Sequence, residues 1–175
     1  GYQVTVFESF DMPGGVLRYG VPEFRIPKKT LDQEINEIKA LGVKIETNFF
    51  IGHTATLEEL SKQDFAAVLL ATGAGIPKFK DLPGANLGGV YYGEEFLMRV
   101  NRAKTSLFSR KLDKLPIGQR VAVIGSGNTA LDCARIGVRL GKEVTLIFRR
   151  TEEDMRVRKD ERTYAKEEGI HFEPM

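Results

Sequence analysis

The chain has 175 residues, of which 42% are hydrophobic and 29% are charged, and its formal net charge is +2. This composition is ordinary for a globular protein of one or two small domains, and it argues against disorder and against an extended nucleic-acid-binding surface. The single cysteine, Cys133, excludes a disulfide within the chain and an iron–sulfur ligand set made by these residues alone.

The first part of the chain shows the pattern of a strand, a helix and a second strand. Residues 3–7 alternate and are rich in β-branched side chains, which predicts a strand ending at Glu8. Residues 43–52 predict another strand with its turn. The helix between them is indicated by apolar residues on one helical face, closed by Gly42. These residues are Leu31, Ile35, Ile38 and Leu41.

A short helix over residues 57–61 precedes a continuous apolar run at residues 65–71. A run of this length followed by a glycine turn predicts a strand buried on both faces. The run is too short to cross a bilayer, and the sequence shows no signal peptide, so we expect a cytoplasmic protein.

Prolines and glycines over residues 77–89 indicate a connector with little regular structure. We place a domain boundary at its start, which divides the chain into domains 1–76 and 77–175. Beyond the connector, residues 93–100 predict a helix, and a polar segment covers residues 103–119.

The remaining residues alternate strands with helices. Residues 121–150 have the pattern of a βαβ unit, which the strand at residues 120–124 opens. Residues 152–168 predict a helix and residues 169–174 a further strand. This alternation implies a mostly parallel sheet, so the chain is predicted to be α/β.

The sequence GYQVTVFE at Gly1 is similar to GKEVTLIF at Gly141. In the second copy, a strand, a glycine turn and a helix precede this segment. If the repeat is real, the first unit lacks about 25 residues that would open it, the usual size of such a unit. We therefore expect a piece of a longer protein with an incomplete first domain and an unpaired strand edge, at which the chain could self-associate.

The segment Gly125-x-Gly127-x-x-Ala130 lies between a predicted strand and a predicted helix, as a dinucleotide fingerprint requires. The first glycine permits a tight turn, the second lets a pyrophosphate approach the backbone, and the alanine permits close helix–strand packing. The N–H groups of residues 126–129 and the helix dipole would favour the phosphate charge. The alternative is a βα turn without a ligand.

The end of the second strand discriminates between nucleotides, because NAD sites place an acid there and NADP sites place arginine. Here the strand ends in Arg149 and Arg150, with Arg156 and Arg158 nearby. A guanidinium can form two hydrogen bonds to a 2′-phosphate, so the pattern favours NADPH over NADH. The alternative is that these are solvated surface charges.

The corresponding strand in the first copy ends in an acid, Glu8, followed by a turn at residues 13–15. An acid at this position would suit the ribose of a second, different nucleotide. The alternative is a surface carboxylate.

Five blocks carry a resemblance to a known family: VFESFDMPGGVLRYGVPEFRIPK, LGVKIETNFFIG, LLATGAG, LPGANLGGVYYGEEFL and residues 121–150. In this order they resemble the FAD- and NADPH-binding region of the glutamate synthase small (beta) subunit family. Dihydropyrimidine dehydrogenase and NADPH–ferredoxin oxidoreductases share this module. The resemblance implies Rossmann-like three-layer parallel sheets in two dinucleotide-binding domains of the pyridine nucleotide-disulfide oxidoreductase type, the first incomplete.

The resemblance also implies residue roles. For FAD, these are Glu8 at the adenosine ribose, Gly14, Gly15 and Val16 along the flavin, Arg25 in contact with it, Ile51 near the adenine, and Ala71, Thr72 and Gly73 near the pyrophosphate. For NADPH, they are Ser126, Gly127, Asn128, Thr129, Arg149, Arg150 and Arg156. Arg156 departs from the proline of many relatives, and Arg25 has the alternative of an ion pair with a carboxylate.

No catalytic side chain and no metal ligand set is expected in such an enzyme, because the cofactors carry the redox chemistry. The resemblance implies hydride transfer from NADPH to FAD, then electron transfer through iron–sulfur clusters of the complete protein or a partner, with glutamate synthesis as the favoured pathway. The implied partner is a large glutamate synthase subunit or a ferredoxin-type acceptor. The alternatives are a ferredoxin reductase, a nucleotide-binding module without catalysis and a simple dehydrogenase.

The family's first GxGxxG turn, its closing FAD segment and its cysteine-rich parts have no counterpart in these residues. We therefore expect this chain alone to bind NADPH modestly and to carry no FAD.

Overall fold

The computed structural model describes residues 1–77, 82–105 and 115–175, so most of the polar segment predicted at residues 103–119 lies outside the described residues. The chain divides into two compact units, Gly1–Lys78 and Phe79–Met175. Each unit is described by itself. No helix of the described residues is long and apolar enough to span a membrane.

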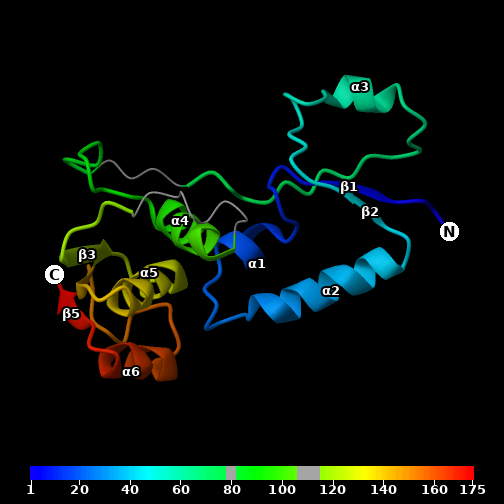
Figure 1. The fold of residues 1–175 in the computed structure, drawn as a ribbon. Coiled ribbons are helices and arrows are strands. Elements are labelled where there is room, and N and C mark those ends of the chain that lie inside the picture. The colour runs from blue at the N-terminus through cyan, green and yellow to red at the C-terminus, as the bar shows by residue number, and fades with distance from the viewer. Residues whose placement is uncertain (78–81, 106–114) are drawn as a thin grey trace. The chain divides into compact units, whose positions relative to one another are not determined.

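The first unit contains a small parallel sheet. Strands β1 (Thr5–Phe7) and β2 (Lys44–Glu46) pair in parallel, and helix α2 (Lys28–Ala40) connects them (Figure 1). The short helix α1 (Gly15–Tyr19) precedes α2, and α3 (Leu57–Ser61) follows β2. The strands predicted at residues 3–7 and 43–52 are therefore present in shorter form, as are α2 and the short helix at residues 57–61.

Helix α2 buries only part of its predicted apolar face. Leu31 and Ile35 are buried, whereas Ile38 and Leu41 are 45% and 84% exposed. The helix ends as predicted at Gly42, whose φ of +92° lies in the left-handed region that favours glycine. The exposed end of the apolar stripe shows that the first unit covers its helix incompletely.

Helix α3 begins with a capping box. The Thr56 hydroxyl accepts the Glu59 N–H at 3.1 Å, and the Glu59 carboxylate accepts the Thr56 N–H at 2.8 Å. These hydrogen bonds from the Thr56 backbone and side chain lower the pKa of Glu59. Local capping therefore explains why this short helix was predictable from sequence.

The prediction of a strand at residues 65–71 is wrong. These residues form no strand and are exposed, with Leu69 88% and Leu70 63% accessible. A strand buried on both faces needs neighbouring strands and a covering layer on each side. In the described part of this unit, the sheet has two strands of three residues each, which cannot supply them.

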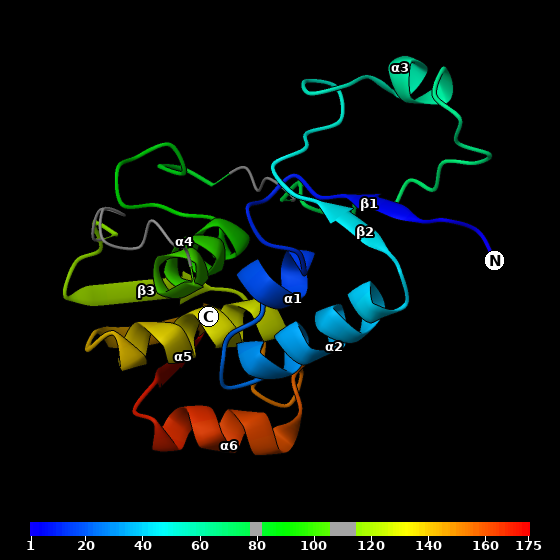
Figure 2. The same ribbon diagram turned by 45° about the vertical axis from the view of Figure 1, so that its right-hand side comes forward.

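The second unit is a three-stranded parallel sheet in the order β3-β4-β5. The strands are β3 (Arg120–Ile124), β4 (Glu143–Phe148) and β5 (His171–Pro174), and the helices are α4 (Gly93–Thr105), α5 (Asn128–Arg139) and α6 (Lys159–Glu167). Helix α5 contacts β3, β4, α4 and α6, and Figure 2 shows it between β3 and α6. The strands and α5 match their predictions closely.

The core of the second unit lies between β4 and its helices. Every second residue of β4 is buried, at Val144, Leu146 and Phe148. Leu131 of α5 and Ala165 of α6 pack against this face of the strand. The core therefore fixes α5, and with it the glycine turn that precedes α5, on the sheet.

Cys133 has the packing role expected of it. It is 5% exposed, and burial raises the pKa of its thiol to about 12. The thiol donates to the Gly93 carbonyl at 3.5 Å, where α4 begins. A protonated, buried thiol is a packing group and not a nucleophile.

The helix predicted over residues 152–168 begins later, at Lys159. Residues 151–158 form turns, because Thr151 donates to the Asp154 carboxylate at 3.0 Å and the Arg156 N–H bonds to the Ser126 carbonyl at 3.2 Å. A helix would use the Arg156 N–H internally. The sequence pattern could not show this long-range hydrogen bond.

Glu168 joins the ends of α5 and α6, and we predict a pH-dependent contribution to stability. Its carboxylate accepts from Arg135 at 2.6 Å and from Arg139 at 2.8 Å. The hydrogen bond from Arg135, helped by Arg139, holds the pKa of Glu168 below its usual value. Glu168→Gln should lower the free energy of unfolding by about 1–2 kcal/mol near pH 7 in a urea titration.

The difference should shrink as the pH falls through the depressed pKa of Glu168, because the native protein then loses the same charge. Glu58→Gln removes the exposed pair between α3 and its C-cap residue Lys62. This variant is the matched control and should change stability by less than about 0.5 kcal/mol. An equal loss for Glu168→Gln at pH 7 and at about pH 3 would contradict the ion-pair explanation.

Candidate functional site

The glycine turn of the second unit joins β3 to α5 at the carboxyl edge of the sheet. The Gly125 N–H donates to the Ile147 carbonyl at 2.9 Å, which fixes the turn to the end of β4. Gly127 is the N-cap of α5, and no side chain caps the helix. The first N–H groups of a helix have no partner within it, so this end is suited to an anion.

The three small residues of the turn differ in their surroundings. Gly125 has a φ of +149°, and a Cβ there would lie 3.0 Å from the Ala130 Cβ. A Cβ at Gly127 would meet no atom within 4 Å. Gly125 and Ala130 are therefore needed for packing, whereas Gly127 opens onto space that a ligand could approach.

Three arginines are connected to this turn, two through the end of β4 and one through a backbone hydrogen bond. Arg149 and Arg150 directly follow β4, whose end is bonded to the turn, and the Arg156 backbone bonds to Ser126. All three side chains are exposed, and no ion pair or hydrogen bond holds their guanidinium groups within the residues that the structure describes. By contrast, Arg158 is paired with Asp160.

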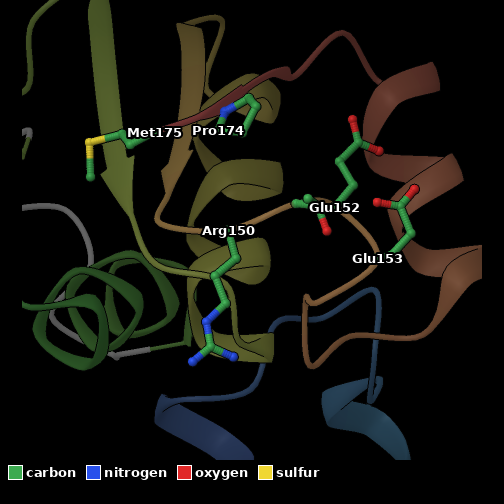
Figure 3. A pocket seen from close by; sticks show the side chains of 6 residues that line it. Arg150, Glu152, Glu153, Pro174 and Met175 are labelled. Carbon is green, nitrogen blue, oxygen red and sulfur yellow. The ribbon is translucent and has the colours of Figure 1, made fainter.

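A shallow pocket at the ends of β4 and β5 also contains acids. Figure 3 shows Arg150 extending away from Glu152 and Glu153, which lie with Pro174 and Met175 around this pocket. Both Glu152 oxygens accept from the Lys166 ammonium, at 2.6 and 2.8 Å. Lys166 therefore neutralises one of the two carboxylates that line this pocket.

The first unit places Glu8 at the corresponding edge of its own sheet. Glu8 directly follows β1, and its N–H donates to the Glu46 carbonyl at 2.9 Å. One carboxylate oxygen accepts from the Phe10 N–H at 3.0 Å and from the Ser9 hydroxyl at 3.3 Å. The half-buried carboxylate is thus oriented by the turn that follows it.

The turn at Gly14 and Gly15 is held by a buried arginine that sequence reasoning missed. Arg18 is 2% exposed, donates to the Pro13 carbonyl at 2.6 Å and pairs with Asp32 of α2. Gly14 has a φ of +127°, and a Cβ there would lie 2.9 Å from Leu31. The glycines are therefore required by backbone conformation, and at Gly14 also by space.

A buried lysine and tyrosine complete this support. The Lys28 ammonium donates to the Leu17 and Val21 carbonyls at 2.7 and 2.6 Å, and burial lowers its pKa. The Tyr19 hydroxyl donates to Asp11 at 2.8 Å, and burial raises its pKa to about 12. In the sequence, the only signal for these contacts is the high number of polar and charged residues in this loop.

The other residues with a predicted FAD role are not gathered at this turn. Val16 is the exception, because it directly follows Gly15 in α1 and is 68% exposed. Arg25 lies after α1, where its N–H bonds to the Pro22 carbonyl. Ile51 forms a bridge with Ala55. Ala71, Thr72 and Gly73 are exposed, and in the described residues no hydrogen bond joins them to Glu8 or to the glycine turn. Their FAD contacts stay predictions.

Comparison with known proteins identifies the family of this fold. The model of the family described as pyridine nucleotide-disulphide oxidoreductase matches residues 5–175. The chain belongs to the pyridine nucleotide-disulphide oxidoreductase family. The predicted α/β class with Rossmann-like parallel sheets is thereby confirmed, and the family is one of redox enzymes.

Curated relatives match nearly the whole chain. It is 39% identical to the beta subunit of an NADP(+)-dependent formate dehydrogenase of Moorella thermoacetica, over 98% of the chain and 24% of the relative. It is 33% identical to the glutamate synthase [NADPH] small chain of Azospirillum brasilense, over 98% of the chain and 36% of the relative. It is 34% identical to the NAD-dependent dihydropyrimidine dehydrogenase subunit PreT of Escherichia coli K12, over 97% of the chain and 39% of the relative.

These matches confirm the resemblance to the glutamate synthase small chain and to a dihydropyrimidine dehydrogenase subunit. The chain spans between 24% and 39% of the length of these three relatives. Their names include both NADP(H) and NAD, so family membership alone does not assign the cofactor.

A solved structure supports the fold independently. The 2-naphthoyl-CoA reductase complex with 2-naphthoyl-CoA matches 99% of the chain and 24% of its own chain, with a TM-score of 0.74 and 21% sequence identity. At this identity the match supports the fold alone.

The surroundings of the two glycines predict that the same substitution destabilises the protein at Gly125 and leaves its stability nearly unchanged at Gly127. Gly125→Ala should lower the free energy of unfolding by about 1–3 kcal/mol, because of its positive φ and its contact with Ala130. Gly127→Ala should leave stability within about 0.5 kcal/mol, since its φ is −100° and the added methyl meets nothing. Thermal unfolding of the two variants side by side is the measurement. Equal destabilisation would contradict the distinction.

Proposed function

We propose that the second unit binds NADPH and the first unit contributes to an FAD site, so that the chain is the nucleotide-binding part of an FAD-dependent NADPH oxidoreductase. The observation that carries this proposal is the position of the open Gly127 turn at the same sheet edge as Arg149 and Arg150, with Arg156 bonded to the turn. Such an edge combines backbone donors for a pyrophosphate with guanidinium groups for a 2′-phosphate.

The residues of the second unit fit a phosphorylated dinucleotide. The uncapped N-terminus of α5 and the space beside Gly127 suit the pyrophosphate. Guanidinium groups without an ion pair are available to an incoming phosphate, and Arg149, Arg150 and Arg156 meet this condition among the described residues. The pairing of Lys166 with Glu152 reduces the repulsion that a 2′-phosphate would meet.

The residues of the first unit fit only one part of an FAD site. Glu8 offers a carboxylate for ribose hydroxyls, and Gly15 lies on a turn locked by Arg18. Bound FAD would accept hydride and release electrons singly. The chain's own residues would hold and orient the two nucleotides, and no side chain is assigned to the chemical step.

The names of the relatives differ in the reaction of the complete enzyme. We propose that the complete protein is an electron-input subunit that passes electrons through iron–sulfur clusters to a partner subunit. The sequence blocks favour the glutamate synthase small subunit, with glutamate synthesis as the pathway, and 39% identity favours the formate dehydrogenase beta subunit as the second candidate. Transfer from NADPH to FAD is common to both candidates.

Removal of Arg149 and Arg150 tests the nucleotide assignment. In the 175-residue chain, Arg149→Ala/Arg150→Ala should weaken NADPH binding about 10- to 100-fold, because charge-assisted hydrogen bonds to the 2′-phosphate are lost. The affinity for NADH, which is expected to be lower than that for NADPH in the native chain, should change by less than about 3-fold in this variant. Isothermal titration calorimetry with both nucleotides measures the ratio.

Arg158→Ala is the matched control, because Arg158 lies in the same loop and is already paired with Asp160. It should leave the NADPH to NADH affinity ratio unchanged. Gly127→Ala should weaken the binding of both nucleotides, since the added methyl group occupies the space beside the turn. An unchanged ratio in the double arginine variant would contradict the NADPH assignment.

Lys166 should influence nucleotide preference through Glu152. Lys166→Met removes the neutralising charge, so NADPH binding should weaken about 2- to 5-fold relative to NADH, the scale of a surface charge interaction. The double variant Lys166→Met/Glu152→Gln should restore the ratio, and Glu152→Gln alone should not lower it. Fluorescence titration with both nucleotides measures this series. Failure of the second substitution to restore the ratio would exclude Glu152 as the cause.

A further inference from the structure

The loop that carries the three exposed arginines is anchored in the core of the second unit. We call residues 149–158 the arginine loop, which joins β4 to α6. Met155 and Val157 are each 6% exposed and belong to the core cluster of this unit. Arg156 lies between these two buried residues, and its own side chain is exposed. The core therefore holds the loop on both sides of Arg156.

The arginine loop is also bonded to the glycine turn. The Arg156 N–H donates to the Ser126 carbonyl at 3.2 Å, directly before Gly127, the N-cap of α5. Because this hydrogen bond uses the backbone of Arg156, it leaves the guanidinium group out of the contact. The core and the turn together thereby set the place from which the Arg156 side chain extends.

Helix α6 holds a second point of the loop, Glu152, through two cationic side chains. Arg162 donates to the Glu152 main-chain carbonyl, and Lys166 donates to both oxygens of the Glu152 carboxylate at 2.6 and 2.8 Å. Arg162 and Lys166 are four residues apart and so lie on one face of α6. The same Glu152 carbonyl accepts from the Met155 N–H at 3.2 Å. The Arg162 bond is therefore made to the turn that leads into the buried part of the loop.

We propose that Arg162 is a positioning residue for NADPH recognition, which acts through the Glu152 carbonyl to fix the arginine loop before a nucleotide binds. This inference rests on the proposed NADPH site and adds to it a residue that acts through the loop backbone. Ordering a loop during binding costs free energy, so a loop that is already ordered gives a higher affinity. The gain is larger for NADPH than for NADH, because the arginines of this loop would contact the 2′-phosphate.

Arg162 and Lys166 act on Glu152 in different ways. Lys166 neutralises the Glu152 carboxylate, so its removal acts through charge. Arg162 bonds to a neutral carbonyl, so its removal leaves the charge of Glu152 unchanged and releases the backbone of the loop. The loss of Arg162 should therefore appear as local opening of the loop, which hydrogen exchange of the Arg156 amide reports.

Substitution of Arg162 in the 175-residue chain tests the inference. Arg162→Met should lower the NADPH to NADH affinity ratio by about 3- to 10-fold, the scale of one hydrogen bond, in isothermal titration calorimetry. Exchange of the Arg156 amide should become faster by about 10-fold or more, whereas that of the Leu146 amide in β4 should change by less than about 3-fold. Arg162→Lys, which keeps a cationic donor at this position, should recover most of the ratio.

Lys159→Met is the matched control. It removes a cation from the same helix, and among the described residues the Lys159 ammonium forms no hydrogen bond or ion pair with the arginine loop. An equal fall of the ratio in this control would assign the effect to net charge and overturn the inference. The double variant Arg162→Met/Glu152→Gln should keep the lowered ratio, in contrast to the restoration expected for Lys166→Met/Glu152→Gln. Restoration in the Arg162 background would overturn the positioning role.

The native chain offers a test that needs no folded variant. Without nucleotide, the Arg156 amide should exchange at least about 10-fold more slowly than in an unstructured peptide of the same sequence. Exchange at the rate of the peptide until NADPH is added would show that the ligand orders the loop, which would overturn the inference.

The outcomes separate this inference from the proposed function on which it rests. An unchanged ratio in Arg162→Met, together with a lowered ratio in Arg149→Ala/Arg150→Ala, would overturn the positioning role and leave the NADPH assignment in place. An unchanged ratio in both variants would overturn both.

Discussion

The hydrogen bond from the Gly125 N–H to the Ile147 carbonyl determines how the second unit can present a ligand site. It ties the glycine turn after β3 to the end of β4, so the two segments open at one sheet edge. Parallel pairing alone would align the strands, but this bond also fixes where the chain leaves β3 and enters α5. The core between β4 and α5 then prevents the turn from moving away.

Much of the second unit was predictable because its signals are local. The apolar alternation of β3 and β4, the GxGxxA spacing and the apolar face of α5 are all read within about 30 residues, the size of a βαβ unit. The start of α6 was not predictable, because the Arg156 N–H bonds to Ser126, which lies far away in sequence. Lys166 and Glu152 were missed for the same reason: they are fourteen residues apart and meet only in the fold.

The first unit shows the opposite case. Its sequence strongly predicts a buried strand, but the described structure offers no neighbouring strands with which that segment could pair. Residues 65–71 have the composition of a buried strand, yet a strand forms only where other strands satisfy its backbone. The loop from Glu8 to Lys28 behaves differently, because its polar residues bond to one another. Arg18, Tyr19 and Lys28 order this loop without a large sheet beside it.

The contrast between the units bears on how nucleotide preference is set. In both, the residue after the first strand of the repeat occupies the sheet's carboxyl edge, and it is Glu8 in one unit and Arg149 in the other. The guanidinium groups at residues 149 and 150 are exposed, so a nearby carboxylate could capture them before a phosphate does. Glu152 lines the same shallow pocket as Arg150, and both of its carboxylate oxygens accept hydrogen bonds from Lys166. Under the proposed NADPH assignment, the ion pair that holds Glu152 would therefore contribute to nucleotide preference together with the arginines.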